Sequence, residues 1–262
     1  MKVTAALGGN ALRQRGEPAD SGIQESHVAR TAAALAPLLC DHQLVVTHGN
    51  PPQAGMLARE SASDPVLSGP YPFGVLGGHT QGMIGYWLVR ALETASPGHR
   101  AGRLFGRTLV KADDPGFSRP PRFVSPVVYE EAEARGWPSQ RGWHFRPEGS
   151  SWRRVVPSPE PAALAELDMI ETLASQGVTM ACARGRRHPS RPAFPGDHGC
   201  AAAEPDPVGG LPGRRDGPQG RGGVRVRDCR RRNSGIGRLA DAAALLAGQA
   251  GTMVAGGEEG HD

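Results

Sequence analysis

The chain has 262 residues, which fits one large domain or two small ones, and 30 Lys and Arg against 26 Asp and Glu leave a net charge of only +4. Four scattered cysteines without a Cys-x-x-Cys pair exclude a disulfide scaffold. No run of about 18 apolar residues could cross a membrane, and the N-terminus lacks the charged and apolar regions of a signal peptide. We therefore expect a soluble protein of the reducing cytoplasm.

The first part of the chain predicts an α/β fold with a mainly parallel sheet, because short apolar runs alternate with helical patterns. Residues 3–7 and 44–47 predict buried strands that end in the turns Gly8-Gly9-Asn10 and His48-Gly49-Asn50. Helices are expected at 26–40, where Pro37 should bend or end the helix, then through residue 60, and at 79–95.

The later elements are less regular. Residues 112–156 are rich in Pro and Trp and predict an inserted, lid-like subdomain with short hairpin strands. Residues 159–176 predict an amphipathic helix that ends at Gly177, and 178–182 a further strand. A helix around 238–246 and a last short strand up to 254 complete the pattern.

Residues 183–235 differ from the rest of the chain. These 53 residues contain 12 Arg, 11 Gly and 7 Pro but only five large apolar residues, and their net charge is +7. Such a stretch cannot bury enough apolar surface to fold by itself, so we expect it to be disordered. The whole chain has only two lysines, Lys2 and Lys111.

The two glycine turns are the first candidate site. The ends of neighbouring parallel strands lie side by side, glycines let backbone N–H groups approach an anion, and an asparagine amide adds a donor. Two such turns could cradle an anion, although Gly-Asn also makes ordinary turns. The chain has no phosphate-binding Gly-x-x-x-x-Gly-Lys motif and no Gly-x-Ser-x-Gly elbow.

Three arginines of the lid-like region, Arg122, Arg153 and Arg154, could grip a carboxylate or phosphate, but a solvated surface face is the simpler interpretation. His48 and His79 could be acid–base groups, yet no carboxylate or second His stands at metal-ligand spacing, so a structural role is favoured and no metal site is predicted. Cys182 is expected in the core.

Five strings occur in order along the chain: ALGGNAL (6–12), LVVTHGNPPQAGMLA (44–58), YPFGVLGGHTQGMIGYWL (71–88), WRRVVPSPEP (152–161) and IGRLADAAALLAGQAGT (236–252). Together they resemble the carbamate kinases of the amino-acid kinase family. The resemblance implies an αβα sandwich with an open, mainly parallel sheet, usually a homodimer. It implies the reaction of ATP with carbamate to give ADP and carbamoyl phosphate, with Mg²⁺ as cofactor. In the family this reaction often proceeds in the direction of ATP formation, at the end of arginine deimination.

The resemblance also assigns the parts of the chain. Residues 1–182 match the substrate-binding half, with 112–156 as its lid, and 236–262 match a remnant of an incomplete nucleotide-binding half. Arg122 stands where the family has a substrate-loop lysine, and Arg153 and Arg154 match the WRRVVPSP motif. Five positions match residues that line the reacting groups in the family: Gly8, Gly9, Asn10, Gly49 and Asn50. The resemblance assigns all of these except Gly8 as catalytic.

The chain departs from the family at important places. Pro51 replaces a glycine of the HGNGPQ motif and removes one N–H donor. Gly74, Gly78 and His79 replace an Asp, an Ala and a Glu. The DKD, TDV and MGPK motifs of the nucleotide half are absent, so no nucleotide-binding residue can be named. Losing one preorganised charge at a transferring phosphoryl group typically costs about 10²-fold or more.

These departures leave alternatives to an active kinase. The chain could be a non-catalytic remnant that binds carbamoyl phosphate or another small anion. Residues 214–232 could contact nucleic-acid phosphates, but no aromatic residue interleaves for base stacking, which disfavours that interpretation.

A change of reading frame is a specific hypothesis for the unusual composition of residues 183–235. Sliding the reading frame by one nucleotide permits Gly-Ile-Pro-Val-Val near residue 187 and Met-Gly-Pro-Lys near residue 216, both of which the family contains. A frameshift with an internal deletion would therefore account for residues 183–235, and a true linker is the alternative.

Overall fold

The structure is a computed structural model. It describes residues 1–8, 11–14, 16–118, 120, 122–123, 129–132, 134–136, 143–183, 186–189, 223–228 and 234–254.

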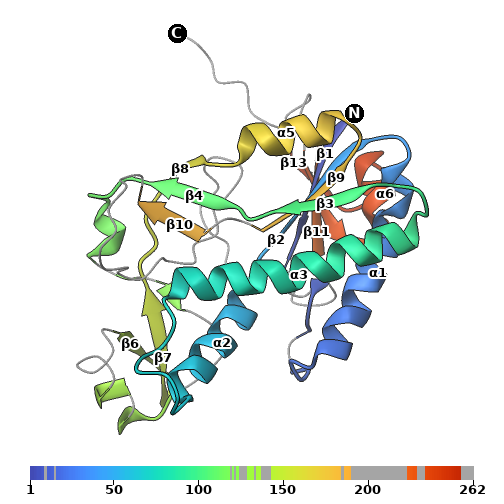
Figure 1. The fold of residues 1–262 in the computed structure, drawn as a ribbon. Coiled ribbons are helices and arrows are strands. Elements are labelled where there is room, and N and C mark those ends of the chain that lie inside the picture. The colour runs from blue at the N-terminus through green and yellow to red at the C-terminus, as the bar shows by residue number, and fades with distance from the viewer. Residues whose placement is uncertain are drawn as a thin grey trace.

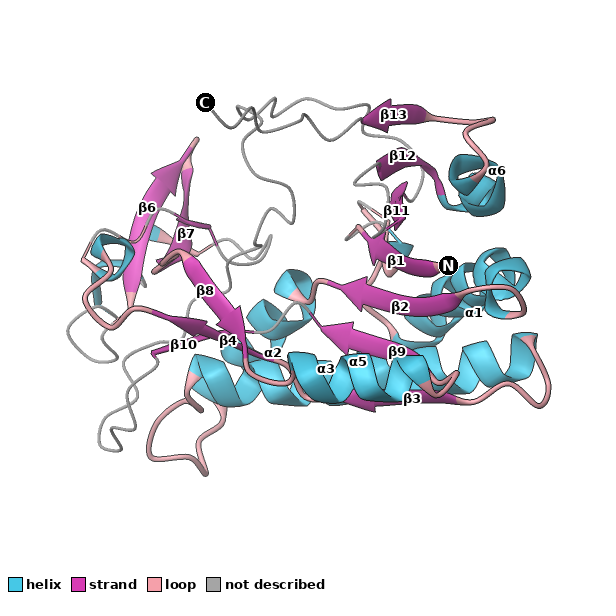
Figure 2. Cartoon of the chain, turned by 90° about the horizontal axis from the view of Figure 1, so that it is seen from above, coloured by secondary structure: helices cyan, strands magenta, loops and turns pink. Residues whose placement is uncertain are grey.

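A seven-stranded sheet forms the centre of the described chain. In spatial order its strands are β13 (Thr252–Val254), β12 (Ser234–Arg238), β11 (Gly223–Asp228), β1 (Lys2–Leu7), β2 (Gln43–His48), β9 (Thr179–Ala183) and β3 (Ala101–Leu104). The four strands from β1 to β3 run parallel, and the three others pair antiparallel. The predicted α/β class with a parallel sheet is confirmed, with an antiparallel extension on one side (Figure 2).

Helices cover both faces of this sheet. The helices are α1 (Ser21–Leu39), α2 (Pro51–Ser63), α3 (Phe73–Ala95), α5 (Leu167–Ser175) and α6 (Ala242–Leu246). Helices α1, α3 and α6 share one face, whereas α5 packs on β2 and β9 from the other side (Figure 1). The αβα sandwich expected from the resemblance is therefore present in the described chain.

Two small sheets lie beside the main one. The first has the order β10 (Arg186–Pro189), β4 (Arg107–Val110) and β8 (Pro161–Leu164). The second has the order β5 (Arg122–Phe123), β7 (Ser151–Val156) and β6 (His144–Glu148). Short 3-10 turns are formed by Pro115–Phe117 and Leu239–Asp241. The hairpin strands predicted within residues 112–156 are thus observed.

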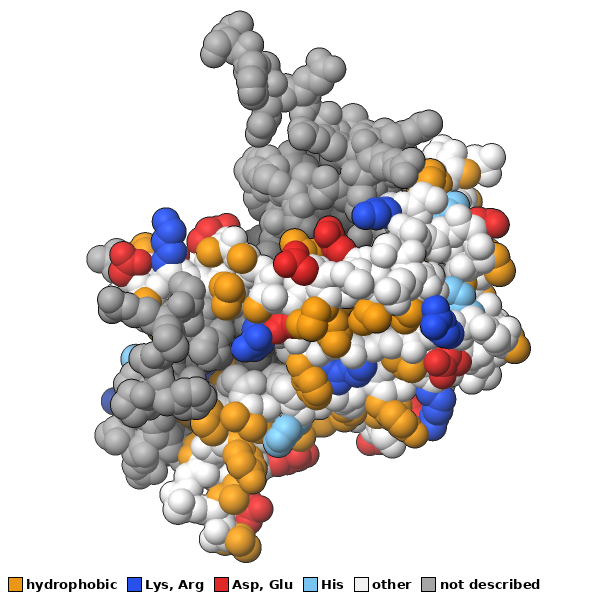
Figure 3. All heavy atoms as spheres, turned by 45° about the horizontal axis from the view of Figure 1, so that its top comes forward, with side chains coloured by type: hydrophobic (Ala, Val, Ile, Leu, Met, Phe, Trp, Pro, Cys, Tyr) orange, Lys and Arg blue, Asp and Glu red, His pale blue; other side chains and the backbone are white. Residues whose placement is uncertain are grey.

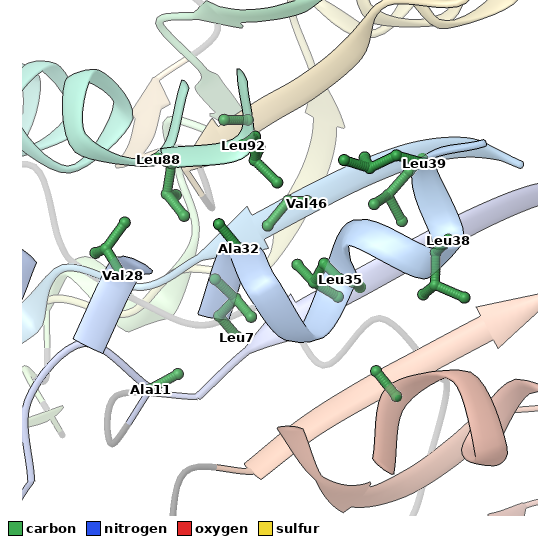
Figure 4. Close-up of a cluster of buried hydrophobic side chains, with 14 of the residues drawn as sticks. Leu7, Ala11, Val28, Ala32, Leu35, Leu38, Leu39, Val46, Leu88 and Leu92 are labelled. Atoms are coloured by element: carbon green, nitrogen blue, oxygen red, sulfur yellow. The ribbon is translucent and has the colours of Figure 1, made fainter. Parts of the chain in front are cut away.

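The main core lies between α1, α3 and the sheet. Val28, Ala32 and Leu35 recur at helical spacing on α1 and are at most 1% exposed. Figure 4 shows them facing Val46 of β2 and Leu88 of α3. Each fully buried Leu or Val contributes about 1.5–3 kcal/mol, so this apolar stripe anchors α1 to the strands that carry the glycine turns.

Helix α1 also shows what Pro37 does. The helix begins at Ser21, earlier than predicted, and continues past Pro37 to Leu39. Proline removes one backbone hydrogen bond. Here that loss falls in the last turn, where the buried Leu38 and Leu39 hold the chain against the core.

Two helix predictions were partly wrong. Within residues 159–176, the first part is strand β8, which pairs with β4, and only Leu167–Ser175 is helical. Within 238–246, Arg238 is the last residue of strand β12, Leu239–Asp241 form a 3-10 turn, and α6 has only five residues. In both places pairing with a neighbouring strand overrides the local helix propensity.

Two stretches of the segment 183–235 form strands. β10 pairs in parallel with β4, and β11 lies between β1 and β12. The expectation of disorder is wrong for these stretches, because strands from the rest of the chain satisfy backbone groups that the segment could not satisfy alone. Ala183 ends β9, and Ser234 and Gly235 begin β12. The remaining residues of the segment lie outside the described ranges.

The α5 face of the sheet is only partly covered. A groove of about 540 Å³ runs between the sheet, α5 and β8, and its lining includes Thr4, Val45, Leu164 and Ile170, with Lys2 also among its residues. None of the helices that the structure describes has the length and apolar content to span a bilayer.

The glycines of α3 give the first testable prediction. A Cβ at Gly85 would lie 2.5 Å from Cδ and Nε of Arg103, whereas a Cβ at Gly78 would meet nothing within 4 Å. We expect Gly78→Ala to raise the free energy of unfolding by about 0.5–1 kcal/mol through helix propensity. We expect Gly85→Ala to lower it by about 1–2 kcal/mol through overpacking.

Urea unfolding of both variants checks this prediction. Combining Gly85→Ala with Arg103→Ala should recover most of the loss. Equal shifts of the same sign for the two glycine variants would contradict the packing of Arg103 on α3.

Candidate functional site

The two predicted glycine turns begin at the same edge of the sheet. β1 and β2 pair in parallel with Leu7 opposite His48, so Gly8 and Gly49 leave neighbouring strands together. The N–H of Ala11 donates to the Gly8 carbonyl at 2.9 Å and closes the first turn. Gly9 and Asn10 lie outside the described residues. The position expected for an anion cradle is thus built from two adjacent strand ends.

Asn50 is buried at 5% exposure and bound to α3. Its Nδ2 donates to Thr80 Oγ1 at 2.6 Å, and Thr80 Oγ1 donates to the Gly77 carbonyl at 2.9 Å. The Asn50 carbonyl accepts from the Ala54 N–H at 3.0 Å as α2 begins. Asn50 therefore joins the end of β2 to both helices that flank it.

Helix α2 opens with two prolines, Pro51 and Pro52. Proline is well suited to a first helical turn, so the departure from the HGNGPQ motif leaves the helix intact. Neither residue has an N–H, however, so two of the donors that a helix N-terminus offers to an anion are missing.

His48 is a buried neutral group. It is 1% exposed, Nδ1 lies 3.4 Å from the Gly49 carbonyl oxygen, and Nε2 has no partner among the described residues. Burial, with a smaller contribution from the nearby Arg103 guanidinium, lowers the pKa of His48 to about 4. The ring therefore adds no positive charge at neutral pH, which agrees with a structural role.

Sequence reasoning missed Arg103, which lies near the carboxyl end of β3. Its guanidinium lies over the Phe105 ring at 4.1 Å, and Nε and Nη2 are buried without a partner among the described residues. Burial lowers the pKa of Arg103 and raises the pKa of the Cys182 thiol to about 11. An arginine inside the short strand Ala101–Leu104 was the only available signal.

Cys182 and His79 take ordinary structural positions. Cys182 is 5% exposed and packs in the cluster beneath α5, as expected. His79 lies on the exposed side of α3, where its ring meets Tyr71 edge to face at 5.8 Å.

The arginines of β7 have different surroundings. Arg153 Nη1 donates to both carboxylate oxygens of Glu148, at 2.7 and 2.6 Å, on the surface side. Arg154 is only 8% exposed, and its guanidinium lies 3.7 Å from the Trp143 ring centroid and 5.0 Å from that of Phe73. Arg122 enters strand β5 opposite Val156, and its side chain is not among those described.

Helix α3 connects the lid arginine with Asn50. Phe73 opens the helix beneath Arg154, and Gly77 and Thr80 bind Asn50 a turn or two later. The rise from Phe73 to Gly77 is about 6 Å. Val156 of β7 also packs with Phe73 in a cluster with α2. The structure thus brings Arg154 and Asn50 to the same end of α3.

The described residues form no metal-binding cluster and, on the face seen in Figure 3, no basic patch. They contain no group of three His, Cys, Asp or Glu side chains placed to hold a metal ion, so none is assigned to Mg²⁺. On the face shown in Figure 3, the described Lys and Arg side chains are dispersed among acidic ones.

Individual known proteins are similar to this chain, although no family model is. No family model matches the chain. It is 43% identical to a carbamate kinase of Rhizobium meliloti strain 1021 over 71% of this chain and 57% of that protein. It is 37% identical to a carbamate kinase of Escherichia coli strain K12 over 70% of this chain and 61% of that protein.

Solved structures agree with the sequences. Carbamate kinase from Giardia lamblia bound to AMP-PNP superposes with a TM-score of 0.64 at 30% identity, covering 71% of this chain and 62% of that one. The chain therefore resembles carbamate kinases in both sequence and fold over about seven tenths of its length. It spans about three fifths of the length of the curated relatives it matches.

The buried His48 predicts a pH dependence of stability. Its pKa of about 4 in the folded chain lies below the ordinary 6.5, so between these values the unfolded chain binds more protons. The contribution of His48 to the free energy of unfolding is therefore constant above pH 6.5. It decreases progressively as the pH falls from 6.5 to 4. Urea unfolding should show that His48 lowers the free energy of unfolding by about 2 kcal/mol between pH 7.5 and pH 5.

His48→Gln, which cannot titrate, is the control. The variant should lose correspondingly less stability over the same pH interval. An unchanged pH dependence would show that His48 is not buried as a neutral ring.

Proposed function

We propose that this protein is a carbamate kinase, which transfers a phosphoryl group between ATP and carbamate. The observation that carries the proposal is the pairing of Leu7 with His48, which sets the two glycine turns side by side at the carboxyl edge of the sheet. In a chain 43% identical to a carbamate kinase, these are the turns expected at the reacting groups.

The reaction asks the protein for positioning and charge stabilisation rather than for covalent catalysis. A carboxylate oxygen of carbamate bonds to the γ-phosphorus of ATP while the bond from that phosphorus to the β,γ-bridging oxygen breaks, and ADP leaves. No proton transfer is needed to balance this step. Backbone N–H groups of Gly8, Gly9 and Gly49, with the amides of Asn10 and Asn50, are proposed to orient the anions and stabilise their oxygens.

The lid arginines and the cosubstrates complete the proposal. Arg122, Arg153 and Arg154 are proposed to bind the substrate, carbamate or carbamoyl phosphate. ATP or ADP would bind with Mg²⁺, which neutralises phosphate charge when present, although no described residue is assigned to either. We propose that the protein works in the cytoplasm as a homodimer, as the resemblance implies.

A second candidate function is the binding of carbamoyl phosphate or another small anion without turnover. Its supporting observation is the position of the two lysines. Lys2 begins β1 at the end of the strand opposite Gly8, and Lys111 is exposed just after β4. Neither lies at the strand ends where phosphates would meet, and Pro51 and Pro52 remove further donors there.

The division of the chain remains part of this proposal. We propose that residues 1–182 bind substrate, with 112–156 as a lid, that 183–235 reflect a frameshift with an internal deletion, and that 236–262 belong to the nucleotide half. Sequencing the coding DNA across these codons tests the frameshift. A shifted frame that cannot spell Gly-Ile-Pro-Val-Val and Met-Gly-Pro-Lys would rule it out.

The activity is tested by mixing the protein with carbamoyl phosphate, ADP and Mg²⁺ and measuring ATP with luciferase. We expect ATP formation, and Asn50→Ala should reduce its rate by about 10²-fold or more. Thr94→Ala, at the far end of α3, is the matched control and should leave the rate unchanged.

Calorimetric titration with carbamoyl phosphate separates the two candidates. Saturable binding without ATP formation would support the non-catalytic function. The absence of both binding and turnover would overturn both.

A further inference from the structure

Arg154 is a buried arginine held by aromatic rings. Its side chain is 8% exposed, and no ion pair or hydrogen bond joins its guanidinium to a described residue. Other arginines of the chain are paired with acids, as Arg153 is with Glu148 and Arg107 with Glu166. Buried cations are normally paired, so this arrangement requires an explanation.

Two aromatic rings lie close to the guanidinium of Arg154. The Trp143 centroid lies 3.7 Å and the Phe73 centroid 5.0 Å from Arg154 Cζ. A stacked ring attracts the cation but uses none of its N–H donors, which project from the edge of the guanidinium plane. A carboxylate partner would occupy those donors. The aromatic contacts orient Arg154 and keep its edge available for an anion.

The charge of Arg154 is retained in this position. Burial lowers the pKa of Arg154 to about 10, with Tyr129 opposing the shift, so the group is a cation at neutral pH. A phosphate dianion is the natural partner for such an edge, because its oxygens match two parallel N–H donors.

The rings also connect the lid with the body of the protein. Phe73 is the first residue of α3, Trp143 precedes β6, and Arg154 lies on β7. Helix α3 carries the Asn50 contacts within its next two turns. The guanidinium is therefore fixed relative to the strand ends where the substrate is proposed to bind.

We propose that Phe73 and Trp143 are positioning residues that hold the Arg154 guanidinium so that its edge receives the phosphate group of carbamoyl phosphate. This inference rests on the proposed binding of carbamoyl phosphate and adds two residues that sequence reasoning did not include. The rings act through Arg154 and need not touch the substrate.

The test measures two properties of Phe73→Leu, Trp143→Leu and Trp143→Phe in the full chain. The first is the Kd of carbamoyl phosphate by calorimetry. The second is the rate at which phenylglyoxal modifies Arg154, measured by peptide mass mapping. This second measurement requires neither substrate binding nor turnover. Tyr86→Leu is the matched control, because it removes an exposed arginine–aromatic contact, to Arg90, from the same helix.

Each Leu variant should weaken carbamoyl phosphate binding about tenfold and speed modification of Arg154. Trp143→Phe, which restores a ring, should stay within about threefold of the unchanged protein, as should Tyr86→Leu. Leu variants that melt at lower temperature but keep the Kd and the modification rate would overturn the inference. A third outcome is that the Leu variants are modified faster while the unchanged protein does not bind carbamoyl phosphate. This result would support the contacts of the two rings with Arg154, but it would overturn both the proposed function and the phosphate-receiving role.

Discussion

The parallel pairing of β1 with β2 is the constraint on which the rest of the structure depends. Five residues after its start, β1 ends opposite His48, and this register decides where both glycine turns begin. A shift of one strand by one residue would turn its buried side chains, such as Leu7 on β1 or Val46 on β2, to the opposite face of the sheet. The apolar stripe of α1, seen against these strands in Figure 4, opposes such a shift.

The strand ends where the substrate is proposed to bind lie near unusual basic groups. Pro51 and Pro52 remove N–H donors from α2, and His48 is kept neutral by burial. Arg103 and Arg154 are instead stacked on aromatic rings. Both arginines keep donors that no described residue uses, but Arg154 alone belongs to a motif shared with the family. The positive charge of these two groups thus comes from side chains set by packing rather than from a helix N-terminus.

Much of the N-terminal fold could be predicted from the sequence because its elements have strong local signals. The apolar runs before Gly8 and Gly49 and the spacing of Ile84, Leu88 and Leu92 correspond to buried strands and to the inner side of α3. Residues 161–164 and Arg238 were predicted as helix because local propensity favours it, but they belong to strands: β8 pairs with the distant β4, and β12 pairs with β11, which comes shortly before it in the chain.

The candidate site could be predicted only in part for a similar reason. The resemblance made Arg154 a candidate substrate-binding residue, but its contacts with Phe73 and Trp143 depend on three separate segments meeting in space. Arg103 was missed because an arginine in a strand is usually a surface residue. Gly9 and Asn10, which the resemblance places at the centre of the site, lie outside the described residues.

The place of β11 in the sheet has a consequence for how the chain is made. β1 is synthesised well before its second neighbour, Gly223–Asp228, which lies far along the sequence. Until that segment leaves the ribosome, one side of β1 presents unpaired backbone groups in a row, an arrangement that invites pairing with other chains. Because long-range strand pairing is intrinsically slow, the yield of folded protein should depend on how well nascent chains are kept apart during this interval.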